Sequence, residues 1–321
     1  MSYFYTFIPS CFQQVQKIEA KLPYLIGYIY CLGASFCTSL RNMFVRRAYD
    51  VPHFQLFFLR VLSLCIIMHF ILKWQRQPLV TSYKKINRLL VIIGLTGTVG
   101  GACSFYGFQV VPLNEATVIF QTQPVIASFL AVFLLKENFD FIQILSAIFC
   151  TIGILLVSKP SFLFGDLGNS PIEKNNEKTT GSLSLLLAAL AIGFQSIFVK
   201  KVVSFVNSNL SVFYIGLIPS IFGSFLMVLE GVKPMTFDEW IVMTYIIVLG
   251  FFAQVLYNRS YRFGDAGKIV MMGYSQIIFG FVLDVLVLGS TLDSFSVIGA
   301  LFVFGCVFLR LFKLWRDKAK E

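Results

Sequence analysis

Residues 117–137 read TVIFQTQPVIASFLAVFLLKE. The stretch has no charged side chain before Lys136. Its length suits a helix that crosses a lipid bilayer, which takes about 20 residues at a rise of about 1.5 Å each. A Gln-Thr-Gln-Pro sequence nevertheless occupies positions 121–124, in the middle of the apolar run. Polar groups and a proline at this depth are tolerated only where they face protein or a water-filled cavity. The stretch therefore predicts a membrane helix with one polar, inward-facing side.

Similar apolar runs recur along the whole chain. Of the 321 residues, 57% are hydrophobic and 13% are charged, whereas about a quarter of the residues of a soluble domain are charged. The runs are long and unbroken, which is typical of membrane helices and not of the alternating strands of a membrane barrel. We expect ten membrane helices, near residues 23–43, 54–72, 89–109, 114–135, 141–158, 182–203, 211–229, 240–259, 266–288 and 294–313.

Lysine and arginine predict the orientation of these helices. With a cytosolic N-terminus, 18 of the 26 Lys and Arg residues fall in cytosolic segments, 7 fall on the other side, and Arg60 lies within a helix. This bias favours a topology with both termini in the cytosol, including an N-terminal segment 1–22 and a tail 314–321. The basic residues gather at the ends of apolar runs, so the net charge of +10 indicates contact with the lipid bilayer and no nucleic-acid partner.

Nothing in the sequence predicts a metal, a cofactor or a catalytic group. The seven cysteines form no CxxC pair and lie mostly inside apolar runs, and the two histidines, His53 and His69, are isolated. No Walker loop and no Ser/His elbow is present. Transport driven by ATP is therefore not expected of this chain alone.

The two halves of the chain resemble each other. SLRNMFVRRA at 39–48 matches FQSIFVKKVV at 194–203, and FYGFQVVPLNEATVIF at 105–120 matches LYNRSYRFGDAGKIVM at 256–271. A third similarity joins 144–156 to 297–309. We expect one five-helix repeat at 23–159, a polar linker at 160–181 and a second repeat at 182–313. Because five is odd, the second repeat must be inverted in the membrane, as in many secondary transporters.

Residues 110–163 resemble the EamA-type domain of the drug/metabolite transporter superfamily. The similarity rests on Glu115-Ala116-Thr117, Pro124, Lys136-Glu137 and Gly153. Arg60 matches a cation in the second helix of that family. In the second half, Ser275 replaces the proline and Gly289-Ser290 replaces the second Gly-Glu pair. A weaker similarity, to the solute carrier 35 group and its G-type subgroup, lies around Phe213-Tyr214 and residues 264–268. The resemblance implies an all-α fold of ten helices in two inverted repeats, and a transport function.

The polar residues of the fourth helix are candidates for binding a solute. On a helical wheel Thr117, Gln121, Pro124 and Ser128 share one stripe, whereas Gln123 points away from it. Pro124 cannot donate a hydrogen bond to the carbonyl of Phe120, so a helix kink is expected there. These groups either line the solute path or bond between helices.

Other candidates lie outside this helix. Arg60 would bind an anionic solute, pair with Glu115 or Asp284, or extend to the membrane surface. Lys268, at the start of the ninth helix, would bind an anion or serve only as a cytosolic anchor. Four further polar residues are expected to face inward: Tyr106, Gln195, Tyr257 and Tyr274.

The sequence favours one function over two alternatives. We expect a multi-pass membrane carrier that moves or exchanges a small organic solute, anionic on the evidence of the basic residues, by alternating access and without ATP. The alternatives are an adaptor with a carrier fold that does not transport, and an intramembrane enzyme built around Asp284. A homodimer is kept open, and neither the plasma membrane nor an internal membrane is favoured.

Overall fold

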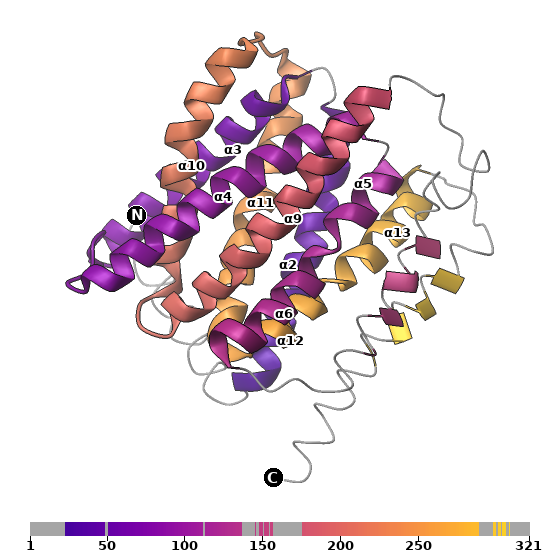
Figure 1. The fold of residues 1–321 in the computed structure, drawn as a ribbon. Coiled ribbons are helices and arrows are strands. Elements are labelled where there is room, and N and C mark those ends of the chain that lie inside the picture. The colour runs from indigo at the N-terminus through magenta and orange to yellow at the C-terminus, as the bar shows by residue number, and fades with distance from the viewer. Residues whose placement is uncertain are drawn as a thin grey trace, which may run out of the picture.

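The computed structural model describes residues 23–48, 51–111, 113–136 and 175–288, with short pieces between 145 and 156 and between 298 and 308. The described part of the chain is helical and contains no strand (Figure 1). Its helices are α2 (Pro23–Arg47), α3 (His53–Trp74), α4 (Lys84–Val110), α5 (Leu113–Phe120), α6 (Gln123–Leu135), α9 (Asn175–Val203), α10 (Ser208–Glu230), α11 (Phe237–Phe263), α12 (Ala266–Met272) and α13 (Ser275–Leu288).

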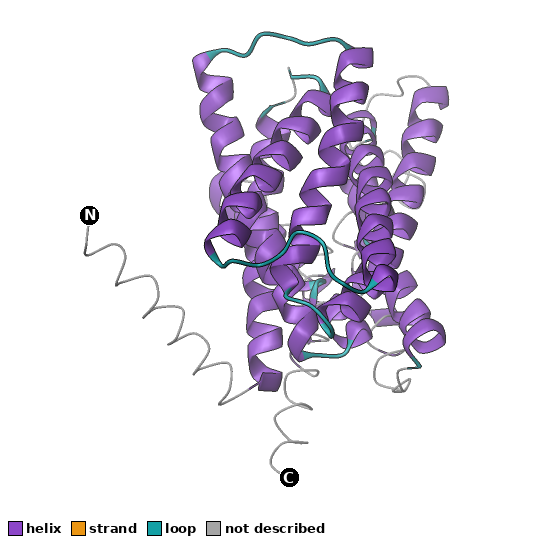
Figure 2. Ribbon diagram, turned by 90° about the vertical axis from the view of Figure 1, so that its left-hand side faces the viewer, coloured by secondary structure: helices purple, strands orange, loops and turns teal. Residues whose placement is uncertain are grey.

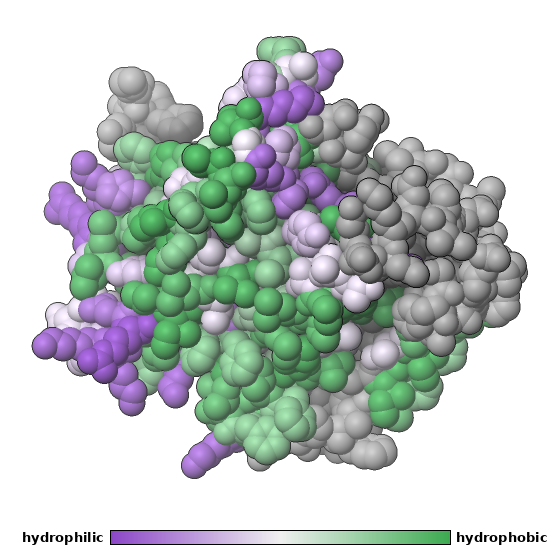
Figure 3. Space-filling model, turned by 45° about the horizontal axis from the view of Figure 1, so that its top comes forward, coloured by the Kyte–Doolittle hydropathy of each residue, from purple (hydrophilic) through white to green (hydrophobic). Residues whose placement is uncertain are grey.

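The helices form a membrane bundle. Among the described residues, six helical segments are long and apolar enough to cross a bilayer: His53–Trp74, Lys84–Val110, Val118–Leu135, Lys178–Val203, Ser208–Glu230 and Phe237–Phe263. They lie side by side (Figure 2). Large apolar side chains such as Phe133 and Phe225 project from the bundle, and apolar residues cover much of the surface in Figure 3. This confirms the expected all-α membrane fold.

Three close helix pairs build the bundle. The helix α2 packs along α11, α4 packs along α9, and α3 packs along α10. The shorter helices α5, α6, α12 and α13 cover another side, where α6 and α5 lie against α9 and α13 and α12 lie against α2. The first helix of each half therefore pairs with the third helix of the other half.

Contacts at the helix ends show that the second half is inverted. The start of α9 meets the end of α4, because a Cβ added to Gly181 would lie 2.6 Å from the Val111 side chain. The end of α11 meets the start of α2, where an added Cβ on Gly27 would lie 3.1 Å from the Phe263 side chain. Each of these pairs is antiparallel, so equivalent helices of the two halves run in opposite directions, as the odd number of expected spans requires.

The bundle has two ends, named here by one residue each. At the Glu230 end, α2, α4 and α10 finish and α3, α9 and α11 begin. The Glu230 carboxylate lies 2.7 Å from His53 Nδ1 and accepts a hydrogen bond from the Phe54 amide, which joins α10 to the start of α3. At the Trp74 end the opposite termini meet, and Lys200 Nζ donates to the carbonyls of Tyr261 and Gly264.

The described helices differ in part from the expected spans. The spans expected at 114–135 and 266–288 are each divided into two helices. The helix α9 begins at Asn175, so the last residues of the expected linker are helical. Most of the spans expected at 141–158 and 294–313 lies outside the described residues. The helices also run past the expected limits, because polar residues at membrane surfaces continue a helix that apolar residues begin.

The helix α2 extends farther than the charge count assumed. The charge count placed Arg41 in the connection between the first two helices, but α2 continues to Arg47 and Arg41 is half-buried within it. Arg41 therefore belongs to the helix bundle and not to the connection between the first two helices.

Close packing between α3 and α10 depends on Gly216. A Cβ added there would lie 2.7 Å from the backbone nitrogen and 2.9 Å from Cα of Cys65. Gly216→Val should therefore force the two helices apart and destabilise the protein by about 1–3 kcal/mol. Thermal unfolding in detergent should show a lower Tm.

The matched control is Gly280→Val, since no described atom lies within 4 Å of a Cβ added to Gly280. Its Tm should stay near that of the parent. Equal falls in the two variants would show that helix propensity, and not the contact with α3, accounts for the effect.

Candidate functional site

The first broken span contains the apolar stretch with Gln-Thr-Gln-Pro at 121–124. The helix α5 ends at Phe120 and α6 begins at Gln123, directly before Pro124. Pro124 has no N–H and its ring would clash with the Phe120 carbonyl in a continuous helix. The Thr122 hydroxyl and the Thr122 amide both donate to the Ile119 carbonyl, at 2.7 and 3.2 Å, which closes a tight turn across the break.

The break buries two amide side chains. Gln121 is 6% exposed and Gln123 is 9% exposed. The turn at 121–122 interrupts the regular 100° step on which the helical wheel relies, so the directions of Gln121 and Gln123 stay a prediction. Neither side-chain amide makes a hydrogen bond within the described part of the chain. Each therefore offers a donor and an acceptor to a solute.

The second broken span has the same form and a different cause. The helix α12 ends at Met272 and α13 begins at Ser275. Tight i→i+3 bonds cross the break, from the Gly273 amide to the Val270 carbonyl and from the Tyr274 amide to the Met271 carbonyl. Ser275 stands where the first half has Pro124, so no proline interrupts this helix.

Gly273 makes room for the second break. A Cβ on this residue would lie 2.5 Å from Oη of Tyr257 and 2.8 Å from the Val270 carbonyl oxygen. The Tyr257 side chain of α11 thus presses against the broken backbone. Tyr274 is fully buried beside it.

The two breaks occupy equivalent positions and the broken spans pack together. Aligning 105–120 with 256–271 sets Phe120 opposite Met271, so α5 and α12 end within one residue of each other. The Ser128 hydroxyl of α6 donates to the Gly267 carbonyl of α12 at 3.3 Å. Val118 of α5 packs on Met271, Tyr274 and Ile277.

The helix α2 follows the second broken span along its length. The Cys31 thiol lies 3.3 Å from the Ile269 carbonyl, and the Ser39 hydroxyl donates to the Gln276 carbonyl at 2.7 Å. Short polar side chains thus bond backbone oxygens on both sides of the break, as broken helices in membranes require.

Two apolar clusters enclose a polar layer. The cluster toward the Glu230 end contains Leu56, Phe57, Val61, Ala102, Phe105, Met243 and Ile246, together with Ala48 and Val51. The larger cluster toward the Trp74 end contains Leu64, Met68, Leu72, Leu90 and Ile93 among its members. Between them, at the same depth, lie Arg60 of α3, Gly97 and Thr98 of α4, Gln195 of α9 and Gly250 of α11.

Within this layer, Gln195 holds helices together. Its Nε2 donates to the Ile93 carbonyl of α4 at 3.1 Å, and a Cβ on Gly97 would lie 2.5 Å from the same nitrogen. Its amide N–H is therefore engaged in packing α9 on α4.

Two arginines meet at Gly250. A Cβ added to this glycine would lie 3.1 Å from Nε of Arg60 and 3.5 Å from Cδ of Arg41. Sequence reasoning singled out Arg60 and missed Arg41, because a basic residue near the end of an apolar run usually marks the membrane surface. In the structure α2 continues to Arg47, and the Arg41 side chain lies beside Gly250, midway along α11.

The remaining predicted residues lie at the ends of the bundle, or their side chains lie outside the described part of the chain. Lys268 is partly exposed and pairs with Asp265 at 2.6 Å at the Trp74 end. Tyr106 lies beside His53 at the Glu230 end, with its hydroxyl 3.5 Å from that of Thr180. The backbone of Thr117 belongs to α5, and its side chain lies outside the described residues. The structure thus gathers Gln121, Ser128, Tyr257 and Tyr274 around the breaks and leaves Lys268 and Tyr106 apart.

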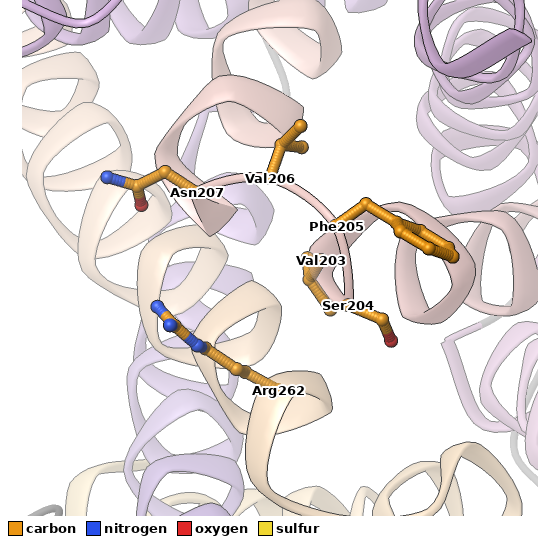
Figure 4. Close-up of a pocket in the computed structure, with 6 residues that line it drawn as sticks. All are labelled: Val203, Ser204, Phe205, Val206, Asn207 and Arg262. Atoms are coloured by element: carbon orange, nitrogen blue, oxygen red, sulfur yellow. The ribbon is translucent and has the colours of Figure 1, made fainter. Parts of the chain in front are cut away.

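A pocket of about 570 Å³ opens at the Trp74 end, lined by residues 203–207 and Arg262. Arg262 extends from α11 toward the turn that carries Asn207 (Figure 4). The pocket lies where α9 and α11 end, away from the two breaks. It therefore belongs to one surface of the membrane and not to the polar layer.

Comparison with known families agrees with this architecture. The sequence profile of the EamA-like transporter family matches the chain twice, over residues 25–159 and 179–312. The chain belongs to the EamA-like transporter family. Proteins of this family usually have ten helices in two repeats. As an EamA-like transporter, the chain is a multi-pass membrane protein that moves a small solute across a lipid bilayer, and transporters are not enzymes.

Several curated relatives cover most of this EamA-like chain. Solute carrier family 35 member G1 of Homo sapiens is 23% identical over 97% of the chain and 86% of its own length. The pseudopaline exporter CntI of Pseudomonas aeruginosa is 22% identical, over 88% of the chain and 95% of its own. The S-adenosylmethionine uptake transporter of Rickettsia prowazekii is 21% identical, over 89% and 92%.

A solved structure has the same fold. It is titled "Crystal structure of protein", and it matches with a TM-score of 0.71 over 89% of this chain and 95% of that one, at 15% identity. The similarity extends the fold to most of the chain.

The contact between Gly273 and Tyr257 gives a test of the second break. Gly273→Ala should lower the Tm and slow transport, because its Cβ would meet Tyr257 Oη at 2.5 Å. Tyr257→Phe removes that oxygen, so the double variant should recover part of both losses. Recovery stays partial, since the Val270 carbonyl lies 2.8 Å from the same Cβ.

The measurement is a double-mutant cycle of Tm in detergent and of uptake in proteoliposomes. Strictly additive effects of the two substitutions would contradict the proposed contact.

Proposed function

We propose that this EamA-like protein is a secondary carrier or exchanger that works by alternating access around the two broken spans. A solute would bind in the polar layer between the two apolar clusters, and the two halves would rock about it. Neither ATP nor a cofactor takes part.

The two helix breaks are the main support for this proposal. Both fourth helices of the inverted halves are interrupted at equivalent positions, and they pack on each other there. Discontinuous helices near the bilayer midplane, at the interface of inverted repeats, are the usual substrate sites of secondary transporters. The unpartnered amides of Gln121 and Gln123 supply the polar contacts that such a site needs.

The apolar clusters support the rocking motion. The cluster at the Glu230 end joins α3, α4 and α11, and the cluster at the Trp74 end joins α3, α4, α9 and α10. Apolar contacts have no direction, so they can part and re-form as helices tilt. Each cluster can thus close one side of the layer while the other opens.

We also propose that the Glu230 end faces away from the cytosol and that both chain termini are cytosolic. At the Trp74 end, Arg76 lies in the described connection and Lys84 and Lys85 begin α4, whereas the connection 231–236 and the first turn of α11 at the Glu230 end carry one lysine. Short cytosolic connections are enriched in Lys and Arg.

Transport is tested by counterflow in proteoliposomes made with the purified full chain. Vesicles loaded with one of a panel of amino acids, organic acids, organic phosphates or nucleotide sugars should take up the same labelled solute without ATP. Gln121→Leu should raise KM for that solute about two- to tenfold, because one hydrogen bond to the solute is lost.

Gln109→Leu is the matched control, since Gln109 lies at the Glu230 end and donates to the Val51 carbonyl at 3.4 Å. Its KM should be unchanged. Absence of counterflow for the whole panel would favour an adaptor that does not transport, and equal effects of the two substitutions would remove Gln121 from the site.

Orientation is tested with one new cysteine at each end. Val232 and Val80 are 61% and 62% exposed, in the connections at the Glu230 and Trp74 ends. In intact cells a membrane-impermeant maleimide should label Val232→Cys, and it should label Val80→Cys only after the cells are permeabilised. The parent protein gives the background from its own thiols, and the reverse pattern of labelling would invert the proposed topology.

A further inference from the structure

Arg41 and Arg60 come from different helices and converge on a third. Both side chains contact the position of Gly250 on α11, and their positive charges lie close enough to repel each other. Arg41 Nη2 donates to the side chain of Asn42 at 2.9 Å, which fixes its direction. Its Nε is buried and has no hydrogen-bond partner among the described residues. Arg60 is half-buried and makes no hydrogen bond or ion pair within the described chain.

The described acidic side chains are occupied elsewhere. Glu230 pairs with His53, Glu239 lies 3.6 Å from Lys233, and Asp265 pairs with Lys268. Asp238 belongs to the first turn of α11, at the Glu230 end. None of these carboxylates approaches the two arginines.

The arginines lie midway along a helix that is long and apolar enough to cross a bilayer. Gly250 is midway between Phe237 and Phe263, the two ends of α11. The apolar cluster with Phe57 and Ile246 lies toward one end of the bundle, and the cluster with Leu64 and Met68 lies toward the other. This depth separates the pair from lipid headgroups, and it places both guanidinium groups in the polar layer.

The charge and the hydrogen-bond donors of the two guanidinium groups indicate what the pair would bind. Two like charges in a medium of low dielectric constant destabilise the protein unless an anion lies between them. A guanidinium presents parallel N–H donors that match the two oxygens of a carboxylate or a phosphate. We propose that Arg41 and Arg60 bind the carboxylate or phosphate group of the transported solute. The proposal rests on the transport function given above and adds the chemical class of the substrate.

The site belongs to one half of the protein. By the alignment of 39–48 with 194–203, Ser196 corresponds to Arg41, and no basic residue of α10 corresponds to Arg60. Arg41 follows Ser39 by two residues, and Ser39 bonds the Gln276 carbonyl just beyond the second break. Because residues two apart on a helix face different sides, Arg41 turns from that span toward α11, and the anion would bind where α2, α3 and α11 meet.

Binding is measured by thermal unfolding of the purified full chain in a neutral detergent. The probes are succinate and glucose 6-phosphate, with mannitol as the neutral control and chloride to hold the ionic strength. At least one of the two oxyanions should raise the Tm in a dose-dependent way, and mannitol should not. If neither does, or if chloride matches them, the proposed oxyanion site is wrong.

Arg60→Gln gives two opposite effects if the proposal holds. Without anion the Tm should rise, because a repelling pair of charges has been relieved. The apparent Kd for the oxyanion should at the same time become weaker by a factor of roughly 30 or more, because one of the paired charges is lost. Arg41→Gln should behave in the same way. Arg262→Gln is the matched control, since it removes one exposed arginine at the end of the same α11, and it should change neither quantity.

Gly250→Ala is the second variant and keeps both charges. Its Cβ would meet flexible side chains at 3.1 and 3.5 Å, so the fold should be retained while the space for the anion shrinks. The apparent Kd should weaken although the net charge is unchanged.

A purely structural role for Arg60 predicts different changes in Tm and in anion binding. If Arg60 forms an ion pair with Glu115 or Asp284, whose side chains lie outside the described residues, Arg60→Gln will lower the Tm and leave anion binding unchanged. Stabilisation by added phosphatidylglycerol alone, with none by succinate or glucose 6-phosphate, would show a lipid site. Either result overturns the proposal.

Counterflow separates this proposal from the proposed function. Exchange of a neutral solute that is insensitive to Arg60→Gln would leave the carrier function standing and exclude the anion site. Loss of counterflow for every solute, with oxyanion binding retained, would do the opposite.

Discussion

A helix can be interrupted inside a membrane only if protein surrounds the interruption. Each break frees backbone carbonyl and amide groups that lipid cannot satisfy, at several kcal/mol for each unpaired group. In this protein two such breaks pack against each other, and side chains from α2, α6 and α11 enclose them. The rest of the bundle follows from that requirement, since α2 must lie along the second broken span and α9 along the first.

The two halves meet this requirement by different means. In the first half a proline interrupts the helix and Thr122 closes the turn. In the second half a glycine gives room to a tyrosine from a neighbouring helix. The two arginines also belong to the first half alone. The helix breaks of the two halves therefore follow the inverted symmetry, whereas the side chains of the polar layer do not. An asymmetric solute requires such an asymmetric site.

The side chains of the interior change from apolar near the ends of the bundle to polar between them. Toward each end of the bundle, apolar side chains and glycines hold helices at short distances, as Gly216 does for α3 and α10. Between these clusters lie amides and guanidinium groups that have few partners in the described chain. Such polar groups destabilise a membrane protein when they have no partner. A solute bound between the two apolar clusters would pair with them and stabilise the protein.

The sequence by itself determined the all-α membrane fold, the inverted halves, the position of the first break at Pro124 and the place of Arg60 inside a span. These follow from hydropathy, internal similarity and the missing N–H of proline, which are properties of the chain alone. Only the tertiary structure decided the second break, where Gly273 and Tyr257 are distant in sequence, and the burial of Gln123, which depends on how the first turn closes. It also decided the partnership of Arg41 with Arg60, because the depth of a residue near a helix end depends on how far the helix continues and on what packs beside it.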